Sequence, residues 1–367
     1  MRFEREIASQ CRKSCDFENA LVSSVRAGPF GRRGWNRPGA SGEASARPRR
    51  ERCKVSPVPE PASSTLSAEV GEALRAHGPV VALESTIISH GLPSPLNLEV
   101  AKDLEALVRE AGACPATVAV LDGVARIGLG PDELARVADG SAMRKLGRRD
   151  LPVAMALGES GATTVSATAW LAAAAGIRVF ATGGLGGIHR GFSESFDESA
   201  DLSVLSETRI TVVSAGVKSV LDVPATLERL ETLSVTVVGY GTESFPGFYL
   251  SSSGYPVDWT VRTPGEVAGI MQRQEEMGIA SALLVANPVP EADQLDPAMH
   301  DRALAEAMRN ADAEGVKGQR LTPYLLASLA ESTHGASIEA NIAAVRGNVR
   351  LGAEIAKAYA GLPRAAT

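Results

Sequence analysis

Residues 179–222 of the sequence read VFATGGLGGIHRGFSESFDESADLSVLSETRITVVSAGVKSVLD. Two apolar runs in this stretch, at residues 179–181 and 210–213, have the character of buried strands. Each run is followed by glycine and polar residues, as is expected where a strand reaches the edge of a sheet. We therefore expect the chemistry of this protein to lie at that edge.

The residues after the first run suit the binding of an anion. Four glycines within residues 183–187 allow the backbone to approach a ligand closely and to turn its N–H groups toward a negative charge. His189 and Arg190 follow directly and could add charge-assisted donors. A tight turn explains the glycines equally well, so this segment alone does not identify an anion site.

Two aspartates and a lysine complete the stretch. Asp197 and Asp201 are four residues apart, so in a helix their oxygens could converge on a hard metal ion, although either could instead cap a helix. Lys218 follows the second apolar run. A lysine with little water around it and cationic neighbours has a lowered pKa and becomes an amine nucleophile, whereas a solvated surface lysine does not.

The composition limits the class of protein. The chain has 367 residues, 44% of them hydrophobic, and a net charge of −6, which is enough for one large α/β domain or two smaller ones. This mild acidity argues against general nucleic-acid binding, and no apolar run reaches the roughly 18 residues that span a membrane. The four cysteines are too few and too scattered for a disulfide framework or a usual zinc site, so we expect a cytoplasmic protein.

Residues 1–61 differ in composition from the rest of the chain. They contain arginine-rich clusters and Gly/Pro breaks, with no sustained helical or strand period. Such a segment buries too little apolar surface to offset the entropy lost on ordering. We therefore predict that residues 1–61 are disordered, and we expect no catalytic role for them.

From residue 67 to residue 362, strand and helix patterns alternate. Strands are expected at residues 79–83, 116–121, 179–181, 210–213, 235–238 and 282–286. Helices are expected at residues 67–76, 95–110, 131–138, 161–175, 224–232, 263–277, 297–314, 322–332 and 337–359. The alternation predicts an α/β fold, namely a single layered α/β/α domain with a central mixed sheet.

Three further positions each allow two interpretations. Glu84 ends the strand expected at 79–83 and is either a paired structural acid or a general acid whose pKa is raised by burial. Lys145 belongs to a basic cluster that is either solvated or presents a cation to a phosphate. Thr164 lies in the first turn of the helix expected at 161–175, where it either caps the helix or borders N–H groups that are open to an anion.

Eight runs of the sequence together resemble one known family. In chain order they are ALESTIISHGLPSP, PATVAVLDG, GATTVSATAW, FATGGLGGIHRG, SFDESADL, VVSAGVKSVLD, VANPVPE and TPYLLASLAE. They closely resemble motifs of the pseudouridine-5′-phosphate glycosidases, and the resemblance extends over residues 67–362. Several long motifs in the same order are far more specific than any single spacing above.

The resemblance implies a C-glycosidase that reversibly cleaves pseudouridine 5′-phosphate to uracil and ribose 5-phosphate, with Mn²⁺ or another divalent cation, as a cytoplasmic homotrimer. It implies that Lys218 is the nucleophile, Glu84 the general acid and Asp197 the metal ligand. The substrate-binding positions that it implies are Lys145, Thr164, Val165, His189, Ser199, Ala200 and Asp201. Some relatives are fused to a sugar kinase for which this chain is too short, so a separate pseudouridine kinase is the implied partner.

The implied chemistry suits this set of residues. A C–C glycosidic bond has no heteroatom leaving group, so the two-carboxylate route of ordinary glycosidases is poorly suited to it. Opening the ribose and trapping C1′ as an iminium on Lys218 supplies an electron sink. Two other functions remain open: a Schiff-base aldolase that acts on a phosphosugar, and a non-catalytic phosphosugar-binding protein. The aldolase requires no base on its substrate, and the binding protein would bind without turnover.

Overall fold

A computed structural model describes residues 64–363 of the chain. The disorder expected for residues 1–61 therefore lies outside the described residues. The strands are β1 (Ser64–Leu66), β2 (Val80–Leu83), β3 (Cys114–Leu121), β4 (Val124–Ile127), β5 (Arg144–Leu146), β6 (Gly161–Thr163), β7 (Val179–Ala181), β8 (Thr211–Ser214), β9 (Thr236–Tyr240), β10 (Thr260–Val261) and β11 (Leu283–Ala286).

The α-helices are α2 (Ala68–Arg75), α3 (Leu96–Glu110), α4 (Pro131–Asp139), α5 (Leu151–Ala156), α6 (Val165–Ala174), α7 (Phe192–Ser195), α8 (Ala200–Glu207), α9 (Val223–Thr232), α10 (Pro264–Met277), α11 (Pro297–Ala313), α12 (Leu321–Ser332) and α13 (Ala336–Ala360). Several begin where the sequence provides a cap. Ser67 accepts a hydrogen bond from the Val70 N–H at the start of α2, and Thr263 forms a capping box with Glu266 at the start of α10.

One sheet joins the strands of the described region. Its main path runs β1-β4-β3-β2-β7-β8-β11-β9-β10. The central strands β2, β7, β8 and β11 pair in parallel, whereas β3 pairs antiparallel with β4 and β6. The predicted mixed sheet is therefore confirmed, and its parallel centre brings the carboxyl ends of four strands to one edge.

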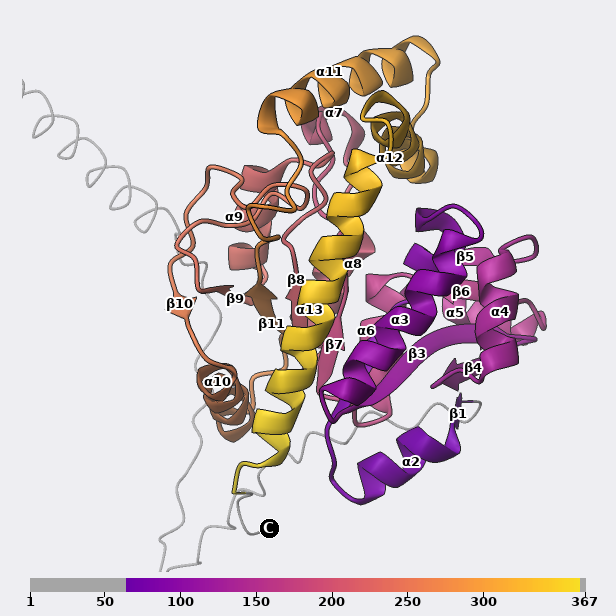
Figure 1. The fold of residues 1–367 in the computed structure, drawn as a ribbon, viewed down its shortest axis with the longest axis vertical. Helices are drawn as coiled ribbons and strands as arrows, with labels where there is room; N and C mark the ends of the chain where they lie inside the picture. Colours follow the sequence, from indigo (N-terminus) through magenta and orange to yellow (C-terminus); the bar gives the residue numbers. More distant parts are fainter. Residues whose placement is uncertain (1–63, 364–367) are drawn as a thin grey trace, which may run out of the picture. The chain divides into compact units, whose positions relative to one another are not determined.

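Helices cover both faces of the sheet because the buried strands alternate their side chains between two cores. In β2, Val80 and Ala82 face the core that contains α6, α8 and α9, while Val81 and Leu83 face the core that contains α3, α10 and α13. Figure 1 shows α3 and α13 side by side in front of the strands. The predicted α/β/α layering is confirmed.

The helix expected over residues 161–175 is wrong at its start. Residues Gly161–Thr163 form strand β6, and α6 begins only at Val165 with Thr164 as its N-cap. The error arose because Gly161, Ala162 and Thr163 are all fully buried, and a short apolar run shows no period that separates a strand from a helix. The rest of α6 is apolar on nearly every side and buried, as expected.

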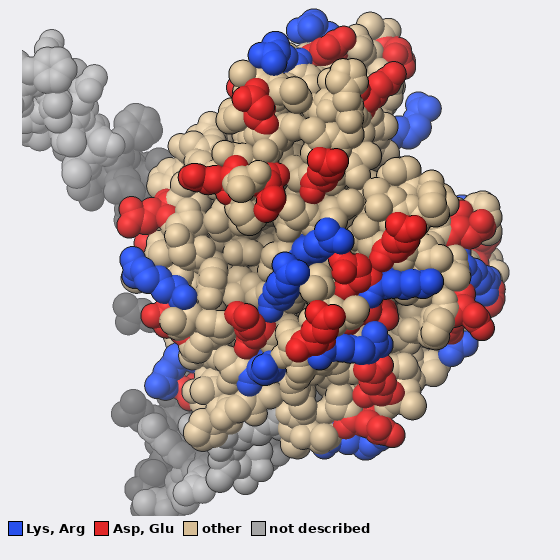
Figure 2. Space-filling view, in the orientation of Figure 1, with Lys and Arg blue, Asp and Glu red and all other residues tan. Residues whose placement is uncertain are grey.

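Charged side chains of both signs are interspersed over the face that α3 and α13 form (Figure 2). Across this face the Nε of Arg346 on α13 donates to Asp103 Oδ2 on α3, at 2.6 Å. Within residues 64–363, no helix combines the length and the apolar character needed to cross a membrane.

Candidate active site

Polar groups gather at the carboxyl edge of the parallel strands. Glu84 directly follows β2, Thr182 directly follows β7, and Lys218 lies four residues after β8. These strands are neighbours in the order β2-β7-β8 and run in parallel, so their carboxyl ends meet. The structure thus brings together the predicted acid and the predicted nucleophile, which are far apart in the chain.

Glu84 is buried and 7% exposed. Burial raises the pKa of its carboxyl group, and the positive charge of Lys218 and a hydrogen bond from Thr182 act in the opposite direction. The Thr182 hydroxyl donates to Glu84 Oε1. A carboxyl group with a raised pKa suits a general acid, so the structure favours that interpretation over a paired structural acid.

Two lysines lie within electrostatic reach of Glu84. Much of the Lys145 side chain is exposed, yet the protein around its amine lowers its pKa, first through lost solvation and then through the charge of Lys218. Lys218 is half-buried, and no side chain among residues 64–363 pairs with its amine. Lys218 is therefore partly shielded from water and has a cationic neighbour.

The glycine loop pairs with the chain that follows β8. Leu185 forms a bridge with Val217, and the Lys218 N–H donates to the Leu185 carbonyl at 3.0 Å. The glycines are required by close packing around this loop. A Cβ on Gly184 would lie 2.5 Å from the Phe248 ring, and a Cβ on Gly187 would lie 2.5 Å from Thr226 Oγ1. Access for a ligand, the reason expected from the sequence, is therefore not needed to explain them.

His189 and Asp197 lie on facing parts of the next loop. The His189 N–H donates to the Asp197 carbonyl at 3.0 Å, and His189 Nδ1 lies 3.9 Å from Asp197 Oδ2. Burial lowers the pKa of His189, while the charge of Asp197 acts to raise it. The imidazole and the carboxylate therefore border one partly buried space.

Asp197 and Asp201 do not converge as oxygen ligands, contrary to the expectation from their spacing. Asp197 precedes α8, whereas Asp201 lies in its first turn and directs both oxygens at main-chain N–H groups. Within residues 64–363, no group of three or more His, Cys, Asp or Glu side chains could hold a metal ion. Asp197 alone fits only a mostly hydrated divalent cation, which one carboxylate can hold together with a phosphate of the substrate.

The remaining predicted contacts lie at two helix starts. Thr164 is the N-cap of α6, but its hydroxyl is paired with the Ser166 hydroxyl, at 2.9 Å, and makes no cap bond. Val165 is the first residue of α6 and is buried. Ser199 caps α8 by accepting from the Asp201 N–H at 3.2 Å, and Ala200 is the first residue of that helix.

Asparagines from β11 and α13 complete the edge. Asn287 Nδ2 donates to Asn348 Oδ1 at 2.9 Å, and Asn348 Nδ2 donates to the Thr182 carbonyl at 2.7 Å. These two are structural bridges, which is the common role of asparagine. Asn341 differs, because its Oδ1 is buried without a hydrogen-bond partner and lies 3.0 Å from where a Cβ on Gly183 would be.

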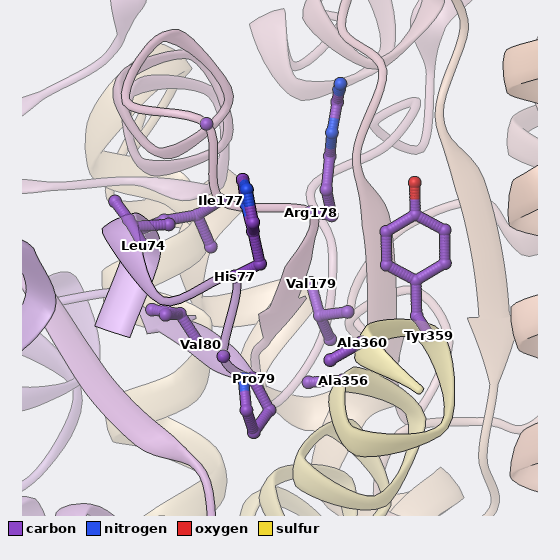
Figure 3. Close-up of a pocket in the computed structure, with 12 residues that line it drawn as sticks. Leu74, His77, Pro79, Val80, Ile177, Arg178, Val179, Ala356, Tyr359 and Ala360 are labelled. Carbon is purple, nitrogen blue, oxygen red and sulfur yellow. The ribbon is translucent and has the colours of Figure 1, made fainter. Parts of the chain in front are cut away.

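A separate hollow lies at the opposite, amino edge of the sheet. His77, Arg178 and Tyr359 extend past the apolar side chains of Val80 and Val179 (Figure 3). The Tyr359 hydroxyl donates to Glu275 Oε2 at 2.7 Å, and Arg178 Nη2 lies 3.6 Å from Glu275 Oε1. This hollow has no lysine and no carboxylic acid with a raised pKa, so we place the chemistry at the carboxyl edge.

Comparisons with known proteins identify the family of this chain. A family model described as Indigoidine synthase A like protein matches residues 69–358. A pseudouridine-5′-phosphate glycosidase of Streptomyces griseus subsp. griseus is 66% identical over 296 residues, which cover 80% of this chain and 92% of the relative. The protein of the same name from Frankia alni is 56% identical over 302 residues, covering 82% of this chain and 84% of the relative.

Two solved structures are similar to this chain. The prealnumycin C-glycosynthase AlnA, in complex with ribulose 5-phosphate, is 35% identical with a TM-score of 0.76, and the match covers 82% of this chain and 97% of that chain. An indigoidine synthase A-like protein from Thermotoga maritima is 38% identical with a TM-score of 0.71, and the match covers 76% and 92%.

Proposed function

The chain belongs to the family of the pseudouridine-5′-phosphate glycosidases, and from this membership we propose that it cleaves the C–C glycosidic bond of pseudouridine 5′-phosphate to uracil and ribose 5-phosphate, reversibly. The observation that carries the proposal is the placement of two groups at one edge of the sheet, after β2 and β8, which flank β7. Glu84 is a buried acid with a raised pKa, and Lys218 is an amine that no side chain of residues 64–363 pairs with.

These two groups support a covalent route. Glu84 donates a proton to the ribose ring oxygen as its bond to C1′ breaks, and the amine of Lys218 forms a bond to C1′ and gives a proton back to the Glu84 carboxylate. The nitrogen lone pair then forms an iminium as the bond between C1′ and the uracil carbon breaks, and that carbon takes up the proton from Glu84. Water adds to the iminium, which releases ribose 5-phosphate, restores the amine and returns a proton to Glu84.

The phosphate lies on the cationic side of the site in this proposal. Lys145 and His189 supply donors, and the starts of α6 and α8 supply the main-chain N–H groups of Val165 and Ala200. The N–H groups of Thr164, Ser199 and Asp201 already donate within the protein. Contacts to the phosphate are remote from the bond that breaks. They therefore provide binding energy that places C1′ against the amine.

Asn341 offers an acceptor that a ligand could satisfy. Its buried Oδ1 lacks a donor, and burying an unpaired acceptor is unfavourable. An N–H of uracil or a hydroxyl of a sugar is a donor of the required kind. We prefer the glycosidase to an aldolase because relatives that are 66% and 56% identical carry that name.

We also propose, from the family resemblance, that Asp197 holds Mn²⁺ or a similar cation through a single carboxylate. When bound, such a cation orients the substrate through its waters. The homotrimer and the separate pseudouridine kinase are further proposals that rest on the same resemblance, and the cytoplasmic location is a proposal that rests on the few, scattered cysteines.

The test is to incubate the protein with pseudouridine 5′-phosphate and Mn²⁺ and to follow uracil release and the mass of a borohydride-trapped adduct. We expect Lys218→Ala to abolish both signals while ribose 5-phosphate still binds. Lys102→Ala, which removes an exposed lysine from α3, is the matched control and should leave both unchanged. Uracil release by Lys218→Ala at the wild-type rate would disprove the covalent route.

A non-catalytic phosphosugar-binding protein is excluded if the wild type releases uracil. A Schiff-base aldolase is distinguished by the substrate. It would form the trapped adduct and cleave a simple sugar phosphate, and it would leave pseudouridine 5′-phosphate intact.

A further inference from the structure

The Asp201 side chain links three backbone segments that meet at the site. Asp201 is the second residue of α8 and is only 5% exposed. Its Oδ1 accepts from the Ser166 N–H near the start of α6, and its Oδ2 accepts from the Gly186 N–H in the glycine loop, each at 2.9 Å. Hydrogen bonds from N–H groups to a carboxylate are stronger than those between neutral partners.

Each linked segment carries a contact that the proposed function requires. The start of α6 holds Val165, the start of α8 holds Ala200, and the glycine loop leads on to His189. The other end of that loop follows Thr182, which donates to Glu84. Asp201 is thus bonded to the loop that runs from Thr182 to His189.

The hydrogen bond from the Gly186 N–H to Asp201 requires the loop to pack tightly against α8. A Cβ at Gly186 would lie 2.7 Å from Asp201 Oδ2 and would also clash with Ser199 Oγ. Only glycine lets the loop approach α8 closely enough for its N–H to reach the carboxylate. The link therefore depends on residues in both segments.

The charge of Asp201 is balanced without an ion pair. Among residues 64–363, no salt bridge involves Asp201, and the groups that face it are the two N–H donors. Lys145 and Glu84 interact with it only electrostatically. Both carboxylate oxygens are therefore directed at the protein main chain.

We propose that Asp201 is a positioning residue, which holds the glycine loop and the start of α6 against the start of α8 and so keeps the phosphate-binding groups of these segments in the arrangement that binds the phosphate. This inference rests on the proposed function and deepens it. It differs from the expectation that Asp201 contacts the substrate, because both of its side-chain oxygens accept from main-chain N–H groups.

The test compares binding with chemistry in Asp201→Asn. The amide keeps one acceptor but places an N–H₂ group against one of the two N–H donors. We expect the Kd for ribose 5-phosphate, measured by calorimetry, and the KM for pseudouridine 5′-phosphate to rise by about tenfold or more, since a hydrogen bond to a charged group is lost. At saturating ribose 5-phosphate, the borohydride-trapped adduct on Lys218 should still form.

A matched control separates positioning from general stability. Glu105→Gln alters another buried carboxylate, which accepts from the Thr117 hydroxyl at 2.6 Å and links α3 to β3 away from the site. It should leave the Kd for ribose 5-phosphate unchanged even where it lowers the melting temperature. Gly186→Ala disturbs the same link from the opposite side, and it should weaken binding in the same way if Asp201→Asn fails to fold.

An unchanged Kd in both Asp201→Asn and Gly186→Ala would overturn the inference. So would loss of the Lys218 adduct with an unchanged Kd, because Asp201 would then act in the chemical step. A wild-type protein that binds ribose 5-phosphate but releases no uracil would overturn the proposed function, while the calorimetric comparison would still decide the role of Asp201.

Discussion

The two edges of the central strands differ in how their polar groups are paired. At the amino edge, the Tyr359 hydroxyl and the Arg178 guanidinium both approach Glu275, so the charges there balance locally. At the carboxyl edge, Lys218 and the Asn341 oxygen have no side-chain hydrogen-bond partner among residues 64–363, and Glu84 is buried with a raised pKa. The carboxyl edge thus has polar groups that are not paired within the protein, whereas the polar groups of the amino edge pair with one another. Groups that are not paired within the protein are the ones that can bind a substrate.

Glu84→Gln should have the largest effect, because it removes the proposed acid of the carboxyl edge. The amide cannot donate the catalytic proton, so we expect kcat to fall by about 10²–10⁴-fold, the usual contribution of a general acid. Uracil release under saturating substrate is the measurement. A variant that keeps wild-type turnover would show that another group protonates the ring oxygen.

The same variant makes a prediction for stability with a defined sign. Because burial raises the pKa of Glu84, the folded state binds a proton more tightly than the unfolded state, and stability falls as the pH rises from the unfolded pKa through the folded pKa. Glu84→Gln should therefore melt higher than the wild type at neutral pH, and the difference should shrink in acid. Melting curves across this pH range give the answer.

Thr182→Val should have a smaller effect, namely a change in the pH dependence of kcat. The Thr182 hydroxyl lowers the pKa of Glu84 by donating to it, so its removal should raise that pKa further. The alkaline limb of the kcat profile should then move to higher pH, because Glu84 stays protonated longer. Thr182→Ser keeps the hydroxyl and serves as the control. If the alkaline limb of the kcat profile does not move in Thr182→Val, then a group other than Glu84 sets that limb.

Tyr359→Phe should have the smallest effect, because it changes the amino edge. It removes the hydroxyl that donates to Glu275 at 2.7 Å, which is worth about 1 kcal/mol. We expect a slightly lower melting temperature and an unchanged kcat/KM. A clear loss of activity would mean that the two edges are coupled through the strands between them.

Much of the fold followed from residue patterns alone. Strand β7 and helix α13 were predicted within a few residues because each is a sustained apolar or periodic run. Strand β6 was mistaken for the start of a helix, since three buried residues carry no period. Strand β4 was not among the expected strands, because its role depends on antiparallel pairing with β3.

The site was predictable where residues directly follow strands. Glu84 follows β2, so its position was apparent before any contact was known. Thr182 was missed, although it follows β7 in the same way, because threonine carries no charge to draw attention. The separate directions of Asp197 and Asp201 could not be predicted, because they depend on a helix that starts between the two residues.

One contact described above joins residues that are 166 positions apart. Asn348, near the carboxyl terminus, donates to the main chain of Thr182, whose hydroxyl meets Glu84. During synthesis on the ribosome, the lysine and the acid therefore emerge well before the helix that completes their surroundings. Until α13 emerges and packs, the Thr182 carbonyl lacks the Asn348 amide that donates to it, so the surroundings of the acid are completed last.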